Sequence, residues 1–210
     1  MPSPSAHGRD PTPPLAIGWP RLAAAAILLV AAAGCATPAP APEPQLGYAH
    51  LGPIRLDVAG IEIVDAYLPP LREPHVEHEF PVSPAEALLR WAQDRLVAAG
   101  RERRARFVIR DAAVREVLLP RKKGLRGLFT TDQSERYDGR VAVALEIRSG
   151  RNFRDAIVEA VAERSRSVPE DASVEERERV FLQITEDLVA SLNGEIEKQI
   201  AAHLAAYRLP

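Results

Sequence analysis

The chain has 210 residues, of which 46% are apolar, 5% aromatic and 27% charged, with a formal net charge of −2. This length predicts one domain of ordinary size with an aliphatic core. The charge balance lacks the basic footprint of nucleic-acid binding, so we expect no nucleic-acid partner. A single cysteine excludes an intramolecular disulfide, and no Cys/His spacing is typical of a zinc site.

The N-terminal residues have the three-part pattern of an export signal. Arg9 and Arg21 make the start positive, and residues 22–33 (LAAAAILLVAAA) form a continuous apolar run. That run spans about 18 Å as a helix, against about 30 Å of bilayer hydrocarbon, so it is too short for a stable transmembrane helix. We therefore predict that residues 1–34 are a signal peptide. The long positive region leaves open a translation start downstream of Met1.

The only cysteine, Cys35, directly follows the small residues Ala32, Ala33 and Gly34. This pattern resembles the lipobox of bacterial lipoproteins, although that family usually has leucine where Ala32 stands. The resemblance implies cleavage before Cys35 and acylation of both its thiol and its new amino group. Two or more acyl chains anchor a protein stably to a membrane. The alternative is an ordinary secretory signal followed by a cysteine without this role.

The residues after the cysteine predict a location and a tether. In lipoproteins an aspartate directly after the cysteine commonly retains the protein in the inner membrane. Ala36 stands there instead, which implies the outer membrane, with the domain facing the periplasm. Residues 35–46 contain alternating prolines, which disfavour a helix and remove strand donors. We expect an extended tether of roughly 30 Å, followed by a single periplasmic domain over residues 47–210.

The domain is expected to begin with strands. Residues 54–67 (IRLDVAGIEIVDAY) have the composition of one or two strands, with Gly60 at a bend or bulge. Residues 68–82 are punctuated by proline and predict a loop or a ragged sheet edge.

A helix is predicted next. Ser83 followed by Glu86 is a capping box, with Pro84 in the first turn. An apolar face continues to Val97, so we expect the helix to run to Ala99 and to stop at Gly100, the usual C-terminal cap.

Three long segments follow. Residues 104–120 predict a strand, with a bulge near Ala112–Ala113, and residues 136–149 alternate between apolar and polar from Val141 onward. Residues 153–168 fit a strand or a helix, but the tight turn before them favours a hairpin partner.

A long helix should then run from Ser173 to about Tyr207, and the glycine of Asn193-Gly194 favours a kink in it. These elements predict an α+β fold: a two-layer sandwich of a mostly antiparallel sheet with two helices on one face.

Few residues suggest chemistry. The only local cluster of metal-capable side chains is His75, Glu77, His78 and Glu79, and we interpret it as solvated residues of a charged sheet edge. Neither GxSxG nor Ser-x-x-Lys occurs. We therefore expect no catalytic residue, no metal site and no cofactor, and a protein that is not an enzyme.

The segment between the two central strands is a candidate contact loop. It combines four basic side chains with apolar ones and two glycines. Such a loop can bind anionic lipid headgroups or a protein partner. The alternative is a hairpin loop whose apolar side chains fold back onto the core. The candidate contact residues are Arg121, Lys122, Lys123, Arg126, Leu128 and Phe129.

The lipobox, the proline tether and the small α+β domain together resemble the small envelope lipoproteins of Gram-negative bacteria. Examples are the lipopolysaccharide-assembly lipoprotein and the auxiliary lipoproteins of ABC-type transport systems. The resemblance implies a non-enzymatic accessory or assembly partner of a larger envelope complex. Two alternatives stay open: a lipoprotein that binds a lipid or glycan between sheet and helices, and a periplasmic hydrolase whose site is assembled from distant segments.

Overall fold

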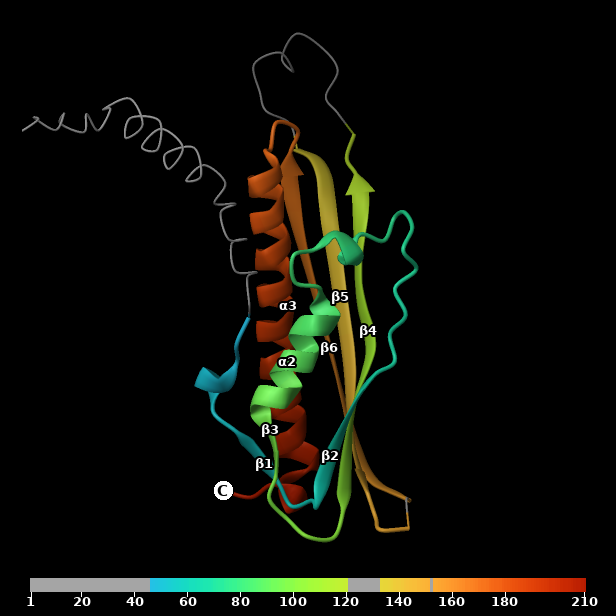
Figure 1. The fold of residues 1–210 in the computed structure, drawn as a ribbon, viewed down its shortest axis with the longest axis vertical. Helices are drawn as coiled ribbons and strands as arrows, with labels where there is room; N and C mark the ends of the chain where they lie inside the picture. The colour runs from blue at the N-terminus through green and yellow to red at the C-terminus, as the bar shows by residue number, and fades with distance from the viewer. Residues whose placement is uncertain (1–45, 121–132, 152) are drawn as a thin grey trace, which may run out of the picture. The chain divides into compact units, whose positions relative to one another are not determined.

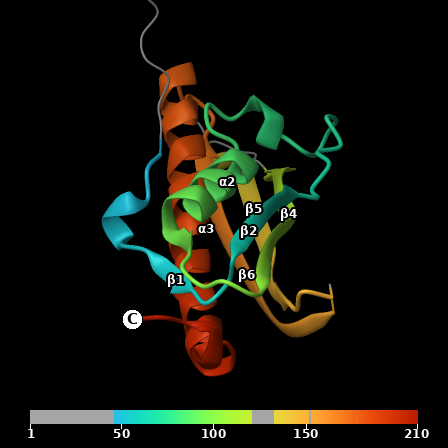
Figure 2. The same cartoon turned by 60° about the horizontal axis from the view of Figure 1, so that its bottom comes forward.

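The structure is a computed structural model that describes residues 46–120, 133–151 and 153–210. In these residues a sheet forms one layer, and helices α2 (Pro84–Arg95) and α3 (Val174–His203) form the other. Both helices lie on the same face of the sheet (Figures 1 and 2). The predicted α+β sandwich is therefore confirmed.

The main sheet has four strands in the order β2-β4-β5-β6. Strands β4, β5 and β6 are antiparallel neighbours, while the short β2 runs parallel to β4. A separate parallel pair joins β1 to β3. The strands are β1 (Ile54–Leu56), β2 (Gly60–Asp65), β3 (Leu96–Ala98), β4 (Arg104–Leu118), β5 (Gln133–Arg148) and β6 (Arg154–Pro169).

The core lies between the helices and the sheet, because every second strand residue faces α2 and α3. On the sheet side Phe107 and Leu145 are fully buried, and on the helix side Trp91 and Leu188 are fully buried. The rings of Trp91 and Phe107 pack 5.6 Å apart across the two layers. Aliphatic side chains supply most of the rest, as the composition predicts.

Helix α2 begins at the predicted capping box of Ser83 and Glu86 but ends at Arg95, four residues before the predicted end at Ala99. The residues after it form β3, which pairs with β1, and the Ala99 N–H donates to the Leu56 carbonyl at 2.9 Å. Hydrogen bonds to a distant strand thus replace the last helical turn.

Gly100 has a different role from the predicted helix cap. A Cβ at Gly100 would lie 2.5 Å from the backbone carbonyl carbon of Asp57 and 2.6 Å from the amide nitrogen of Val58. Only glycine allows the two chain segments to approach this closely. The residue therefore marks a backbone contact between the segments after β1 and β3.

Strand β4 contains its bulge earlier than predicted. The register with β5 shifts between Ile109 and Asp111, rather than at Ala112–Ala113. Ile109 and Ala112 are both fully buried in the core although they are three residues apart, which strict alternation forbids. An extra residue at the bulge restores the core-facing register and turns Asp111 outward.

Strand β6 confirms the hairpin interpretation of residues 153–168, since it pairs with β5 along nearly its whole length. Helix α3 begins at the predicted capping box of Ser173 and Glu176 and continues through Asn193-Gly194 to His203. Among the described residues, no helix combines the length and apolar character needed to cross a bilayer.

Candidate functional site

The sheet has an outer face, formed by the residues of β4, β5 and β6 that alternate with the core-facing ones. Ala113 and Ala144 are buried on this side and do not belong to the core between sheet and helices. No described helix covers the outer face, since both α2 and α3 pack on the opposite side (Figures 1 and 2).

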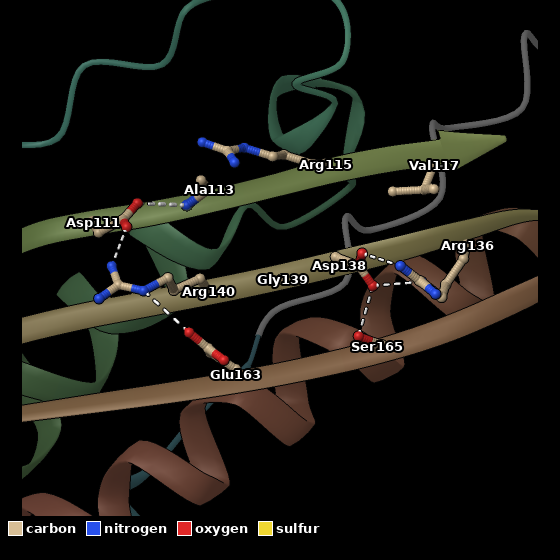
Figure 3. A pocket seen from close by; sticks show the side chains of 10 residues that line it. All are labelled: Asp111, Ala113, Arg115, Val117, Arg136, Asp138, Gly139, Arg140, Glu163 and Ser165. Carbon is tan, nitrogen blue, oxygen red and sulfur yellow. Dashed lines mark hydrogen bonds and ion pairs between the residues drawn. The ribbon is translucent and has the colours of Figure 1, made fainter.

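A groove of about 680 Å³ hollows the outer face near the end of β4 and the start of β5 (Figure 3). Its walls combine basic, acidic and small side chains from three strands. They are Asp111, Ala113, Arg115 and Val117 of β4, Arg136, Asp138, Gly139 and Arg140 of β5, and Glu163 and Ser165 of β6.

One chain of charges crosses the groove from β4 to β6 (Figure 3). Arg140 Nη1 donates to Asp111 Oδ2 at 2.5 Å, and Arg140 Nε lies 3.2 Å from Glu163 Oε1. The central guanidinium therefore pairs with a carboxylate on each neighbouring strand. Its fork of donors suits such two-sided pairing.

A second cluster surrounds Asp138 (Figure 3). Arg136 donates to both carboxylate oxygens, at 2.8 and 2.7 Å, and the Ser165 hydroxyl donates to Oδ1 at 2.7 Å. The hydrogen bonds from Arg136 lower the pKa of the Asp138 carboxyl below its usual value. Arg115 of β4 is the direct neighbour of Asp138 in the β4–β5 register.

A third pair extends the pattern along the sheet. Arg110 Nη1 of β4 donates to Glu159 Oε1 of β6 at 2.5 Å, although β5 lies between these strands. The β5 residues in between are Ala142 and Ala144, whose small side chains leave room for the two long ones to meet. The fully buried state of Ala144 is consistent with cover by this pair.

These ion pairs fix the positions of the charged groups that the outer face presents. Its guanidinium and carboxylate groups already hold one another in fixed positions, so the face offers a preorganised pattern of donors and acceptors. Such a pattern suits recognition of another macromolecule, in which charge complementarity sets specificity and register.

The predicted charged edge of residues 75–79 is wrong for Glu77. This side chain is only 3% exposed, and its carboxylate accepts hydrogen bonds from the Tyr67 hydroxyl at 2.6 Å and the Val114 N–H at 3.0 Å. Burial, followed by the hydrogen bond to Glu77, raises the pKa of Tyr67. His78 and Glu79 are exposed, as predicted.

Backbone pairing explains why Glu77 turns inward. Strand β2 pairs with only the first part of β4, and beyond it the Val76 N–H donates to the Val114 carbonyl at 3.0 Å. His75 forms an isolated bridge with Arg115, and its Nδ1 lies 3.7 Å from Glu77 Oε2. The loop thus covers the free edge of β4, and Glu77 fastens it there.

A smaller hollow of about 380 Å³ lies between this loop and α2. Tyr67 and Glu77 contribute polar groups to it, while Phe80 and Leu89 contribute apolar walls. Within the described part of the chain, no three His, Cys, Asp or Glu side chains are grouped so that they could hold a metal ion.

The site residues predicted from sequence lie elsewhere. Cys35 and the contact-loop residues Arg121, Lys122, Lys123, Arg126, Leu128 and Phe129 lie outside the described residues. In the sequence these loop residues stand between β4 and β5. Sequence reasoning missed the groove, although Arg136, Asp138 and Arg140 continue the period of two that begins at Val141.

No family model and no curated protein matches the chain. Two solved structures of PelC dodecamers from Paraburkholderia phytofirmans show a distant likeness. The structure of a single-substitution variant in space group C2 is 13% identical to this chain. The likeness covers 67% of this chain and 93% of the PelC chain, with a TM-score of 0.23. The structure in space group P6 is 12% identical to this chain, covers 72% of this chain and 94% of the PelC chain, and has a TM-score of 0.22. Likeness at this level supports no functional argument.

Proposed function

We propose that the chain is a lipid-anchored accessory protein of a bacterial envelope complex, with no enzymatic activity of its own. In this proposal residues 1–34 direct export, Cys35 receives the acyl chains, and residues 36–46 form the tether. The domain over residues 47–210 then binds a protein partner at the periplasmic face of the outer membrane. The export pattern and the lipobox resemblance support the location, and the outer face supports the binding role.

The observation that carries the binding role is the extent of the outer face. Strands β4, β5 and β6 have 15, 16 and 16 residues. At about 3.3 Å per residue and about 4.8 Å between strands, three such strands cover about 50 by 14 Å, or roughly 700 Å². A stable protein interface buries about 800 Å² on each partner. The outer face therefore has the area of a protein-binding surface.

The alternative of a lipid or glycan held between sheet and helices needs a cavity there. The space between these layers is instead filled by fully buried side chains, including Trp91, Phe107 and Leu188. The groove and the smaller hollow are both open at the surface. This arrangement favours a partner that docks from outside over a ligand enclosed in the core.

Isolation of the full-length protein from solubilised membranes of its native host tests the proposal. We expect one envelope protein to co-purify in constant ratio, and expect Arg140→Glu to reduce its recovery because this change reverses the charge between Asp111 and Glu163. Lys198→Glu on the exposed surface of α3 is the matched charge reversal and should leave recovery unchanged. A chain that purifies alone under every condition contradicts the proposal.

The basic loop requires a separate variant, in which Arg121, Lys122, Lys123 and Arg126 are all changed to serine. If the loop contacts lipid or partner, liposome binding at low salt and partner recovery should both fall, while thermal unfolding stays the same. A loop that only closes the hairpin would leave all three measurements unchanged.

A further inference from the structure

Arginines gather at one end of the sandwich, opposite the end that contains the groove. The segments at this end are β1, the turn from β3 into β4, the turn from β5 into β6, and the C-terminal residues (Figures 1 and 2). Hydrogen bonds join three of these segments. The Ala59 N–H donates to the Arg103 carbonyl at 2.6 Å, and the Asp57 N–H donates to the Tyr207 carbonyl at 2.8 Å. The arginines of this basic end are Arg55, Arg101, Arg103, Arg104, Arg148, Arg151, Arg154 and Arg208.

The charges at the basic end do not balance, although the formal net charge of the whole chain is −2. The eight arginines stand beside four carboxylate side chains, those of Asp57, Glu102, Glu146 and Asp155. The groove is different, because its three arginines stand beside three carboxylates. The basic end therefore has an excess of positive charge that the groove lacks.

The strand register brings three of these arginines into one row. Arg104 of β4 is opposite Arg148 of β5, and Arg148 is opposite Arg154 of β6. Like charges directly opposite one another destabilise a sheet. Glu146 offsets part of this repulsion, since its carboxylate lies 2.6 Å from Arg148 Nη2 and 3.8 Å from Arg154 Nη1. A row of like charges that lowers folding stability points to a role in binding.

Several guanidinium groups of the basic end have donors to offer an external anion. Five exposed arginine side chains have no hydrogen bond or ion pair within the described residues: Arg55, Arg101, Arg104, Arg151 and Arg208. Arg55 and Arg208 together line an open hollow of about 330 Å³ that has no acidic side chain in its walls. A guanidinium presents a planar fork of donors that matches a phosphate group bidentately. Phosphate is therefore the anionic group that these side chains fit.

An exposed aromatic ring accompanies the arginines. Phe153 is 70% exposed and stands between Arg151 and Arg154 in the sequence. The Ser149 N–H closes this turn by donating to the Phe153 carbonyl at 2.9 Å. Basic side chains beside exposed apolar ones are typical of segments that lie in the headgroup layer of a membrane. In that layer arginine meets the phosphates while the ring enters the boundary with the acyl chains.

The path of the chain brings the basic end within reach of a membrane anchor. Residues 46–53 lie against the last turn of α2, where the Tyr48 N–H donates to Asp94 Oδ2 at 2.8 Å, and they lead directly into β1. The tether expected after Cys35 spans roughly 30 Å. The far end of the sheet is about 50 Å from the basic end, since β4 has 15 residues. An anchor at Cys35 therefore favours contact through the basic end.

We propose that the basic end docks on the anionic phospholipid headgroups of the membrane that holds the acyl chains. This proposal rests on the proposed function and adds the orientation of the anchored domain. The arginines bind headgroup phosphates, Phe153 inserts beside them, and the groove at the opposite end of the sheet faces away from the bilayer toward the protein partner. An acidic protein is the other occupant that fits an excess of positive charge, and the experiment separates the two.

Site-specific photo-crosslinking in the full-length chain, in the envelope of the native host, tests the orientation. The photoreactive residue is placed at position 153 or at position 118. Leu118 is the matched control, because it is 77% exposed and ends β4 at the opposite end of the sheet. We expect phospholipid adducts at position 153 and none at position 118.

Removal of charge tests what holds the contact. The acylated full-length protein is reconstituted into vesicles with a polarity-sensitive fluorophore on Phe153→Cys. The fluorophore should report burial in phosphatidylcholine vesicles that contain phosphatidylglycerol, and no burial in vesicles of phosphatidylcholine alone. High salt should weaken the contact, because it screens the attraction between arginine and phosphate.

Two triple variants make this measurement specific. The test variant replaces three unpaired arginines of the basic end: Arg101→Ser, Arg104→Ser and Arg151→Ser. The control variant removes the same charge from exposed arginines elsewhere: Arg72→Ser, Arg90→Ser and Arg179→Ser. The test variant should lower the equilibrium constant for contact roughly 100-fold without lowering the Tm, whereas the control variant should leave both nearly unchanged.

Each outcome decides the matter. Protein adducts alone at position 153 overturn this inference in favour of an acidic protein. The inference is also overturned by the absence of adducts at position 153, by lipid adducts equally frequent at position 118, or by a test variant that binds as the control variant does. Mass spectrometry of the same protein separates these results from failure of the proposed function, which an unmodified Cys35 would contradict.

Discussion

Arg95 is the side chain whose removal should disturb the fold most clearly. It is 4% exposed and joins three parts of the chain. Its Nε donates to the Gly52 carbonyl at 2.6 Å, its Nη1 donates to Asn193 Oδ1, and its Nη2 pairs with Glu197 Oε1 at 2.8 Å. The segment just before β1, helix α2 and helix α3 therefore meet at one guanidinium.

The magnitude follows from these contacts. Arg95→Ala leaves the Gly52 carbonyl without this donor, which destabilises by about 1–3 kcal/mol, and it removes a charge-assisted bond worth about 1.5–3 kcal/mol. Glu197 is 47% exposed, so water replaces much of its lost partner. We therefore expect a total loss of about 3 kcal/mol, in the lower part of the range that these two contributions span.

Urea and thermal unfolding measure this loss. For a domain of this size, about 3 kcal/mol corresponds to a Tm decrease of roughly 6–12 °C. Arg90→Ala is the matched control, because Arg90 is an exposed arginine on the same helix and should change stability by less than about 0.5 kcal/mol. Equal effects of the two substitutions would refute the role assigned to Arg95.

Three further predictions concern the backbone, a charge pair and a metal. Gly100→Ala should destabilise by about 2–3 kcal/mol in urea unfolding, because its Cβ would overlap the Asp57 backbone; Gly150→Ala, with open space around it, should be nearly neutral. In the folded protein the pKa of Asp138 lies below its ordinary value of about 3.9, so the ionised carboxylate stabilises the fold above that pH. This stabilisation is lost as the pH falls through the folded-state pKa of Asp138. Asp138→Asn should therefore flatten the pH dependence of unfolding below about pH 4, and an unchanged profile contradicts this. Joint replacement of His75 and His78 by alanine should leave the metal content of the purified protein unchanged and near zero, whereas a loss of bound zinc would contradict the expectation that these histidines hold no metal.

Local sequence signals predicted most of the architecture. Both capping boxes locate a helix start, since Ser83 and Ser173 each bond the backbone three residues on. The period of two in β4 and β5 identified the sheet, and the turn after Arg148 identified the hairpin. These signals act within a few residues, so a single sequence carries them.

The features that were missed depend on contacts between distant residues. Leu96 and Val97 fit the apolar face of a helix, and only pairing with β1 makes them a strand. Glu77 looks solvated beside other charges, and its burial requires Val114, 37 residues away. The groove likewise needs the β4–β5–β6 register to bring Asp111, Arg140 and Glu163 together.

The most direct test of the central claim is mass spectrometry of the mature protein isolated from the membranes of its native host. A lipid-anchored accessory protein should begin at Cys35, with a diacylglyceryl group on the thiol and an acyl chain on the amino group. Cys35→Ala should release the folded domain from the membrane fraction, because the acyl chains are its anchor. A mature chain that carries an unmodified Cys35, or that is cleaved elsewhere, would contradict the account.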